Sequence, residues 1–414
     1  MKMEQHSLIL SAAFVVLVLI QTGSGRDLRN VTEPKIPPSC IKLKGSGVDD
    51  TKTIQTALDT CSKGKAVELS SGTFQSGPLT IPSGVGLHVQ EGVTLRASTT
   101  AALYDMGDNL CGTIDDLGLG CKPFITILRA TGSGIYGKGV IDGRGGSRMT
   151  GSNLTWWHLA RQAVTVRKLQ NNPRLIQIND SVDITVYQIT LINAPFYHLT
   201  TSETYGFTVW GITINAPGSA LNTDGIDPVG SQNVTIAYCN VTTGDDNVGI
   251  KALTAPSRYT SVFNNYFGHG NGISIGSETN FGVSEVTVYN LTTINTHNGI
   301  RIKSNTFRGG LVTNVLFENV CINNVQWPIY LDTRYYHMTG SGMPIFRNIT
   351  IRNVKVLTNG TFIFHGFSQS NPIEVTLDDV HIKEGFKFSE HYTKITGSFA
   401  EDVSGSQCGT FGNE

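Results

Sequence analysis

The sequence predicts an all-β fold, a parallel β-helix closed at its N-terminal end by a short helix. The first observation is a phrase of apolar residues and threonine that recurs eight times, with steps of 23, 27, 28, 24, 29, 34 and 26 residues. Steps of this size match one coil of a stacked solenoid, with Gly and Asn at its corners. The phrases begin at Ile184, Phe207, Val234, Val262, Val286, Val315, Ile349 and Val375. A propeller or sandwich is the rival fold, but this period is too short for a four-stranded blade.

The second observation is the composition. The chain has 414 residues, of which 46 are Gly and only 15% are charged, which fits one long repeat domain or two globular ones. Alternation within each phrase should send Val and Ile into the core and Thr outward. Earlier β runs are expected at 66–69, 79–81 and 85–89. A cylinder of this kind presents a long face that suits an extended polymer.

A short amphipathic helix is expected between Asp49 and Cys61, where an Asp cap precedes Ile54 and Leu58 on one stripe. A helix at this point could cover the open end of the solenoid. The only other helical segment that the pattern allows lies between residues 156 and 169.

The N-terminus has the features of a secretory signal peptide. Lys2 precedes an apolar run, 8–20, that is too short to span a membrane, and the small residues 23–25 follow it. We therefore expect a signal peptide at 1–25, a single β-helix domain at 26–414 and a secreted, extracellular protein; a buried N-terminal helix is the alternative. Eight Asn-X-Ser/Thr sequons are compatible with secretion, at Asn30, Asn153, Asn179, Asn233, Asn240, Asn290, Asn348 and Asn359.

Seven cysteines suggest disulfides in an oxidising compartment. Two near pairs could close short loops, Cys40 with Cys61 and Cys111 with Cys121. At least one thiol then stays unpaired among Cys239, Cys321 and Cys408.

The formal net charge is −1, which argues against nucleic acid or an anionic membrane as the main partner, because both favour a basic face. We expect a monomer with no cofactor and no metal ion. Any binding of a polyanion must use local cations.

Four polar motifs follow one another at solenoid spacing. The steps are 21 residues from Asp224 to Asp245, 25 from Asp246 to Asn271 and 30 from Asn271 to Arg301. The three carboxylates should therefore meet on neighbouring coils, where crowding raises the pKa of at least one. Such a set can protonate a glycosidic oxygen while a carboxylate activates water. The alternative is that an Asp at a coil corner only caps a turn, as we expect for Asp227 and Asp332.

Two cations follow the acids. Arg301 and Lys303 flank one residue, so both side chains of a strand would point outward and could hold a carboxylated sugar. They could instead only pair with the acids, and Lys251 has the same two roles open to it. Tyr335 could stack on a sugar ring or serve as a core or rim aromatic.

At these motifs the chain closely resembles the pectin-degrading polygalacturonases of glycoside hydrolase family 28, in wording nearest the bacterial branch. The likeness covers most of the chain after residue 48 and includes Asn222-Thr223-Asp224, Gly244-Asp245-Asp246, Ile273-Ser274-Ile275-Gly276-Ser277 and Arg301-Ile302-Lys303. It implies a right-handed β-helix that hydrolyses α-1,4 linkages of galacturonic acid in pectin (homogalacturonan) with inversion and without cofactor.

The resemblance also implies roles for single residues. Asp245 matches the general acid, and Asp224 and Asp246 match the pair that activates water. Arg301 and Lys303 match the binders of the substrate carboxylate, and Tyr335 matches a tyrosine that contacts substrate. We add Asn222 to the expected substrate-binding set.

One departure from the family pattern concerns a histidine. An ungapped match puts Asn271 where the family has His, and His269 lies two residues earlier, about 6 to 7 Å along a strand. We therefore expect either that the turn brings His269 into the catalytic set, or that Asn271 serves as a neutral partner. Three functions follow: an active polygalacturonase, a catalytically silent pectin-binding protein, or a Ca²⁺-dependent lyase on the same fold.

Overall fold

The structure is a computed structural model that describes residues 25–403 and 407–409. The predicted signal peptide, 1–25, lies outside the described residues except for Gly25. Within the described ranges no helix is long and apolar enough to cross a membrane.

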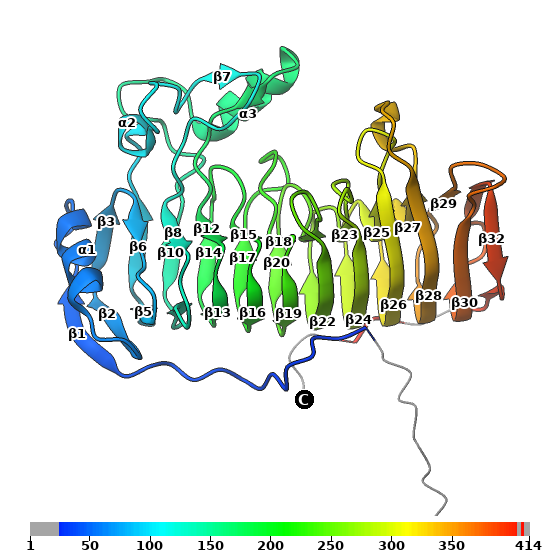
Figure 1. Ribbon diagram of the computed structural model, residues 1–414, viewed down its shortest axis with the longest axis horizontal. Helices are drawn as coiled ribbons and strands as arrows, with labels where there is room; N and C mark the ends of the chain where they lie inside the picture. The colour runs from blue at the N-terminus through cyan, green and yellow to red at the C-terminus, as the bar shows by residue number, and fades with distance from the viewer. Residues whose placement is uncertain (1–24, 404–406, 410–414) are drawn as a thin grey trace, which may run out of the picture.

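The chain forms a right-handed parallel β-helix, as predicted, with its coils stacked along one axis (Figure 1). Across the described residues, 20 strands form the larger sheet: β1 (Ser39–Lys44), β2 (Lys65–Ser71), β3 (Thr73–Ser76), β5 (Val85–Val89), β6 (Thr94–Ala97), β9 (Gly134–Tyr136), β10 (Val140–Asp142), β13 (Val182–Tyr187), β14 (Thr190–Ile192), β16 (Tyr205–Trp210), β17 (Thr213–Asn215), β19 (Gln232–Ala237), β20 (Asn240–Thr242), β22 (Ser257–Phe267), β24 (Val283–Ile294), β26 (Gly310–Asn323), β28 (Pro344–Val356), β30 (Ile373–Ile382), β32 (Thr393–Thr396) and β33 (Phe399–Glu401).

A second sheet runs along another side of the cylinder and carries the site described below. Its 11 strands in the described part of the chain are β4 (Leu79–Thr80), β8 (Ile125–Leu128), β12 (Ile176–Asn179), β15 (Leu199–Ser202), β18 (Ile226–Val229), β21 (Val248–Ile250), β23 (Ile273–Ile275), β25 (Asn298–Lys303), β27 (Trp327–Asp332), β29 (Thr361–His365) and β31 (Lys387–His391). Neighbouring strands are parallel and in register, so each coil adds one strand to this sheet.

The recurring phrases stack directly on one another in the larger sheet. Ile184 pairs with Phe207, Phe207 with Val234, and Val234 with Thr260. The phrase expected to begin at Val262 therefore begins two residues earlier, because Val262 pairs with Ile236. With that correction the two steps on either side of Thr260 are both 26 residues.

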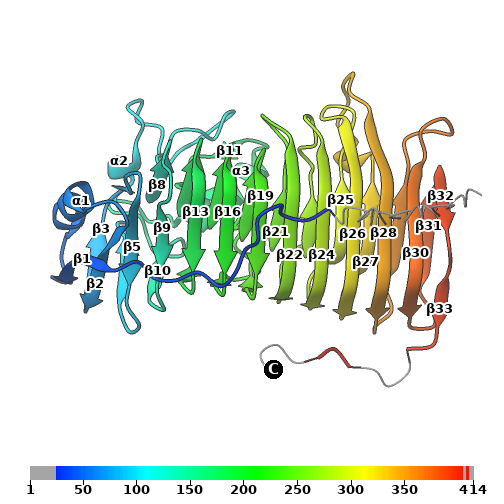
Figure 2. The ribbon, with the colours of Figure 1, turned by 60° about the horizontal axis from the view of Figure 1, so that its bottom comes forward.

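The inward residues are buried as predicted, but the outward threonines are not free. The segment after Gly25 lies across the larger sheet (Figure 2), so that Thr208 and Thr235 are only 6% and 2% exposed. Arg29 donates to the Thr208 hydroxyl at 3.2 Å, and the Thr235 hydroxyl donates to Asp27 at 2.7 Å. Outward threonine here therefore provides the hydrogen bonds that hold a strap of N-terminal residues.

The predicted first helix is present as α1 (Thr51–Thr60) and covers the N-terminal end of the solenoid, burying Ile54 and Leu58 (Figure 1). The predicted aspartate cap is present only by position. Asp50 is the N-cap residue, but its carboxylate makes no capping hydrogen bond and instead accepts from the N–H of Ser46.

The second helical segment is α3 (Trp156–Thr165), and the short α2 (Ala101–Tyr104) was not predicted. These helices and the antiparallel pair β7 (Ile114–Asp115) and β11 (Leu169–Gln170) project from the coils at the N-terminal half (Figure 1). A 3₁₀ turn, η1 (Tyr335–His337), follows β27.

Both predicted disulfides are present, and a third joins two of the remaining cysteines. The bonds are Cys40–Cys61, Cys111–Cys121 and Cys321–Cys408. Cys239 is the unpaired thiol among the described residues and is fully buried. The Cys321–Cys408 bond ties residues near the chain end to β26, across a sequence separation of 87.

Asparagine residues inside β24, β26 and β28 stack on one another from coil to coil. Asn290, Asn319 and Asn353 have φ of 52°, 56° and 46°, the left-handed conformation that Asn tolerates better than most residues. The Asn319 amide donates to Asn290 at 3.1 Å and accepts from Asn353 at 2.6 Å. Another sequon asparagine, Asn233, is 1% exposed and accepts from the Leu28 N–H, so a glycan has no access to it.

We predict that Asn319→Ala lowers the free energy of unfolding by about 1–3 kcal/mol, because Ala loses both amide hydrogen bonds and is strained at positive φ. Asn319→Gly loses the same bonds without the strain and should cost less. Chemical denaturation of the three proteins measures the difference. Equal losses for Ala and Gly would contradict a contribution from the backbone conformation.

Candidate active site

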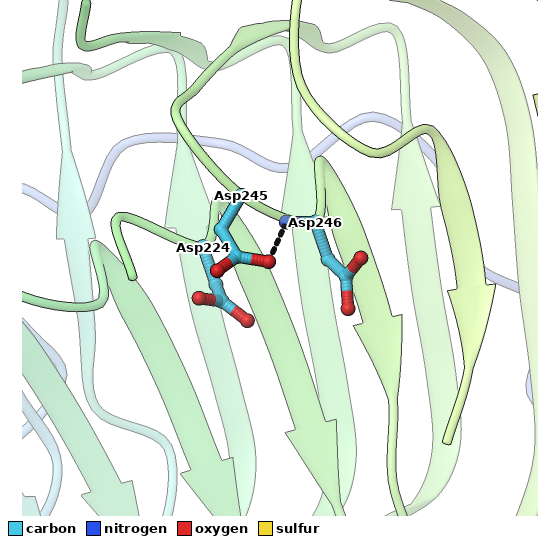
Figure 3. Close-up of side chains that lie close together, drawn as sticks. All are labelled: Asp224, Asp245 and Asp246. Carbon is cyan, nitrogen blue, oxygen red and sulfur yellow. Dashed lines mark hydrogen bonds between the residues drawn. The ribbon is translucent and has the colours of Figure 1, made fainter. Parts of the chain in front are cut away.

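The three aspartates of the polar motifs meet at the start of two neighbouring strands of the 11-stranded sheet. Asp224 lies two residues before β18, and Asp245 and Asp246 lie just before β21. Figure 3 shows the three carboxylates side by side, with the Asp246 N–H donating to Asp245 at 2.9 Å. One oxygen from each lies within 4.8 Å of the others.

Asp224 and its neighbour Asp227 share a lysine. The Lys251 ammonium lies 3.0 Å from Asp224 and 2.5 Å from Asp227, and all three side chains are buried. The prediction that Asp227 caps a turn is therefore wrong, because its carboxylate forms a buried ion pair with Lys251. Asp332 does cap a turn, since its carboxylate accepts from the Arg334 N–H at 2.8 Å.

Asp246 is the best neutralised of the three acids. Its oxygens accept from Lys303 at 2.8 Å, from Arg301 at 3.3 Å and from the Ser274 hydroxyl at 2.8 Å. Burial alone would raise the pKa of Asp246, but Lys303 and Arg301 outweigh it and lower that pKa to about 2. Asp246 is therefore ionised across the working range of most enzymes.

Asp245 receives amide donors but no cation among the described contacts. One oxygen accepts from the Asn271 side chain at 3.0 Å, and the other accepts from the Asn222 side chain at 3.3 Å. Asn222 is itself held by Gln170, which belongs to β11 of the projecting region, at 3.0 Å. The projecting region thus orients the amide that faces the central acid.

Burial raises the pKa of Asp245 to about 7, and the charges of Asp224 and Asp246 act in the same direction. Burial also raises the pKa of Asp224, to about 8, against the opposing effect of Lys251. Because the two acids lie side by side they titrate as a pair. We assign the shared proton to Asp245, since the ammonium that touches Asp224 favours the ionised form of that residue.

The three acids line a cavity of about 480 Å³ together with nearly all of the other predicted site residues. The predicted residues in its wall are Asn222, Asp224, Asp245, Asp246, Asn271, Arg301, Lys303 and Tyr335. The Tyr335 hydroxyl accepts from Arg301 at 3.0 Å, and its ring lies 5.1 Å from the Arg301 guanidinium and 5.3 Å from the Lys303 ammonium. Tyr335 is therefore a rim aromatic that covers both cations.

His269 is the exception, because it is not in the cavity wall. Its Nε2 lies 2.9 Å from the carbonyl of Ala216, a residue of the loop after β17. The turn therefore does not bring His269 inward. The cavity instead receives Asn271 at this coil.

An imidazole nevertheless reaches the cavity from the next coil. His297 lies in its wall, and the backbone N–H of His297 donates to the Gly270 carbonyl at 2.7 Å. Sequence reasoning overlooked His297, Tyr197, Trp327 and Tyr330, which also line the cavity. A signal was available for His297, which lies four residues before Arg301 and therefore one coil beyond Asn271.

Comparison with known proteins agrees with this geometry. The sequence model of the family described as "Glycosyl hydrolases family 28" matches residues 61–404 of this chain. The chain belongs to this family. An endo-polygalacturonase of Pectobacterium parmentieri is 45% identical over 388 residues, covering 92% of this chain and 96% of that protein. A polygalacturonase of Ralstonia solanacearum is 39% identical over 420 residues, covering 84% of this chain and 79% of the relative.

The solved polygalacturonase of Erwinia carotovora ssp. carotovora superposes with a TM-score of 0.87 at 44% identity, covering 90% of this chain and 100% of that one. The predicted family, its bacterial character and the glycoside hydrolase class are therefore confirmed.

We predict that Lys251→Met lowers the free energy of unfolding by about 3–5 kcal/mol at neutral pH, because Asp224 and Asp227 then lose their buried partner. Without the ammonium, burial raises the pKa of both acids further, so both are protonated in the folded state below that pKa. The loss should therefore shrink as the pH falls and grow as it rises. Denaturation at several pH values, with the exposed Lys355→Met as control, measures this; a loss independent of pH would contradict it.

Proposed function

We propose that this protein is a secreted polygalacturonase that hydrolyses α-1,4-galacturonosyl linkages in pectin. The observation that carries the proposal is the pair of acids Asp224 and Asp245, whose raised pKa values keep a proton in the cavity at weakly acidic pH beside the ionised Asp246. The names of the similar enzymes from Pectobacterium and Ralstonia support the substrate. The disulfides support an extracellular location, since such bonds persist in oxidising compartments.

The contacts suggest a role for each acid. Asp245 donates its proton to the glycosidic oxygen, and Asp224 and Asp246 hold and activate the attacking water. One oxygen of Asp224 is buried without a protein partner, which leaves an acceptor free for that water. Asp246 has both oxygens engaged by cations, so its part is to hold charge rather than to accept the first proton.

We propose inversion of the anomeric centre, although the acids lie closer together than is usual for that outcome. Inverting enzymes commonly separate their two carboxyl groups by about 6.5–9.5 Å, whereas the oxygens here approach within 4.8 Å. Lys251 on Asp224 and the cation pair on Asp246 weaken both acids as nucleophiles, and the cation pair keeps Asp246 ionised. That charge pairing favours activation of water over covalent attack.

The substrate carboxylate is assigned to Arg301 and Lys303. Both cations already contact Asp246, so the two roles considered for them from the sequence are compatible. The Arg301 Nε is buried without a partner, and a lysine ammonium has three donors of which one is used by Asp246. These donors remain for a uronate at the cavity mouth, with Tyr335 against the sugar.

We expect purified protein to release reducing ends from polygalacturonic acid, and Asp245→Asn to lower that rate about 100- to 10,000-fold, as for loss of an acid catalyst. The rate of the unchanged protein should fall as the pH rises through about 7, because Asp245 then loses its proton. The exposed Asp108→Asn is the control and should keep full activity.

Two other outcomes would redirect the function. Retention on immobilised galacturonan without turnover, unchanged by Asp245→Asn, would indicate the pectin-binding protein that Asn271 suggests. A product that absorbs in the ultraviolet and disappears with chelator would indicate a lyase, since the three carboxylate oxygens are close enough for a cation to bridge them. The cations that contact Asp224 and Asp246 favour the hydrolase, because they already neutralise the acids that a metal ion would need.

We predict that Asn271→His raises turnover on polygalacturonic acid by on the order of 10 to 1000 fold with little change in affinity. An imidazole can hold a proton next to Asp245, whereas an amide cannot titrate near neutral pH. His269→Ala should change little, because that ring contacts the Ala216 carbonyl outside the cavity. Steady-state kinetics of both variants check this, and loss of turnover in His269→Ala would contradict it.

A further inference from the structure

The outward row of the 11-stranded sheet continues past the cations that flank the acids. In exact succession, Lys303 of β25 pairs with Asp332 of β27, Asp332 with His365 of β29, and His365 with His391 of β31. Figure 2 shows β25, β27 and β31 following one another toward the C-terminal end. Parallel strands lie about 4.8 Å apart, so His365 and His391 sit about two and three strand spacings beyond Lys303.

This row opens into a second cavity of about 690 Å³, larger than the one at the acids. The two cavities share Tyr330, whose ring lies 5.6 Å from the Arg301 guanidinium and whose hydroxyl donates to Asp332 at 2.9 Å. The wall of the second cavity is lined by Tyr330, Asp332, Arg334, His337, Ile363, His365, Gly366, His391 and Tyr392. A chain that leaves the acids past Tyr330 therefore enters this cavity directly.

The charges in this cavity are unbalanced. Among the described residues, Arg334 forms no ion pair; one of its nitrogens donates to the Phe367 carbonyl at 2.8 Å. The single carboxylate, Asp332, is already occupied by the Tyr330 hydroxyl and the Arg334 N–H. The cavity therefore presents one guanidinium with no carboxylate paired to it among the described residues, together with three histidine side chains.

Two of the imidazoles are held against each other. The His365 and His391 rings lie 5.0 Å apart, and the His365 Nε2 lies 2.9 Å from the Ser389 hydroxyl. Burial lowers the pKa of His365, Asp332 opposes this, and His391 and Arg334 lower it further. Protonating neighbouring imidazoles beside a guanidinium is unfavourable unless an anion lies between them.

We propose that this second cavity binds galacturonate units that extend past Arg301 and Lys303, with Arg334, His365 and His391 contacting their carboxylates. This inference rests on the proposed function, because it takes the polymer from it. No three histidine or carboxylate groups of the cavity lie close enough to hold a metal ion among the described residues, so an anion fits the cluster better than a cation. The ring of Tyr392, 5.8 Å from the Arg334 guanidinium, holds that side chain in place.

The test compares two proteins that both carry Asp245→Asn. One has no other change, and the other, the double variant, also carries His365→Gln and His391→Gln, which keep hydrogen-bonding side chains but remove both imidazoles. Binding of oligogalacturonates of increasing length is measured by calorimetry at weakly acidic and neutral pH, in the Asp245→Asn background so that nothing is hydrolysed. We expect the double variant to bind long oligomers about threefold to tenfold more weakly at acidic pH and the shortest oligomer equally well. The difference should be smaller at neutral pH, because burial lowers the pKa of His365 and the ring is then uncharged.

Two controls make the outcome specific. His88→Gln removes an imidazole from β5, in the other sheet at the far end of the solenoid, and should bind every oligomer as the unchanged protein does. Fully methyl-esterified oligomers lack carboxylates and should not distinguish the double variant. Equal binding of long oligomers by both proteins, an equal loss at every length, or no binding at all would overturn the proposal. Release of reducing ends by the protein without these substitutions is scored separately, so failure of the hydrolase assignment would be recognised by itself.

Discussion

The constraint on which the rest of this structure depends is the in-register stacking of parallel strands. Each outward residue of the 11-stranded sheet lies directly beside its counterpart on the next coil, so residues 22 to 51 positions apart in sequence become neighbours. A fold of this kind makes rows of like residues, which stabilises stacked asparagines and apolar stripes. The same property becomes costly when a row contains acids, because stacked carboxylates repel each other.

The acids are tolerated because cations are stacked beside them. Lys251 neutralises Asp224 and Asp227, and Arg301 and Lys303 neutralise Asp246. Of the three acids, Asp245 alone has no cation in contact among the described residues, and it is also the most exposed of them. The pattern of charge pairing therefore distinguishes Asp245, which contacts no cation, from Asp224 and Asp246, which do, although all three residues are aspartates.

Much of this could be predicted from the sequence, since a period and an alternation are local properties. The phrases at Ile184 and Phe207 stack as the period predicts, and the helix at 51–60 follows from its apolar stripe. What failed depended on contacts between distant segments. The outward threonines are covered by residues 25–29, and Cys408 reaches Cys321 across 87 residues, neither of which any spacing rule contains.

The site shows the same division. The period brought Asp224 and Asp246 together correctly, but it could not say which lysine would contact which acid, nor that Asp227 is part of the cluster. His297, one coil beyond Asn271, was missed because the search followed single motifs and not the spacing from coil to coil. The register of the sheet, once known, identifies such residues, because it shows which residues of neighbouring coils lie side by side.

Asn271 illustrates how much a single side chain can alter within an unchanged frame. Its amide N–H and its backbone N–H both donate to Asp245, at 3.0 Å to the carboxylate and 2.8 Å to the carbonyl. A donor that cannot accept a proton favours the ionised carboxylate and so opposes the raised pKa that burial creates. An imidazole at the same position could release its own proton and let the acid keep one. The carboxylates, cations and cavity are therefore compatible with hydrolysis, while the amide of Asn271 opposes the effect of burial on the proton of Asp245.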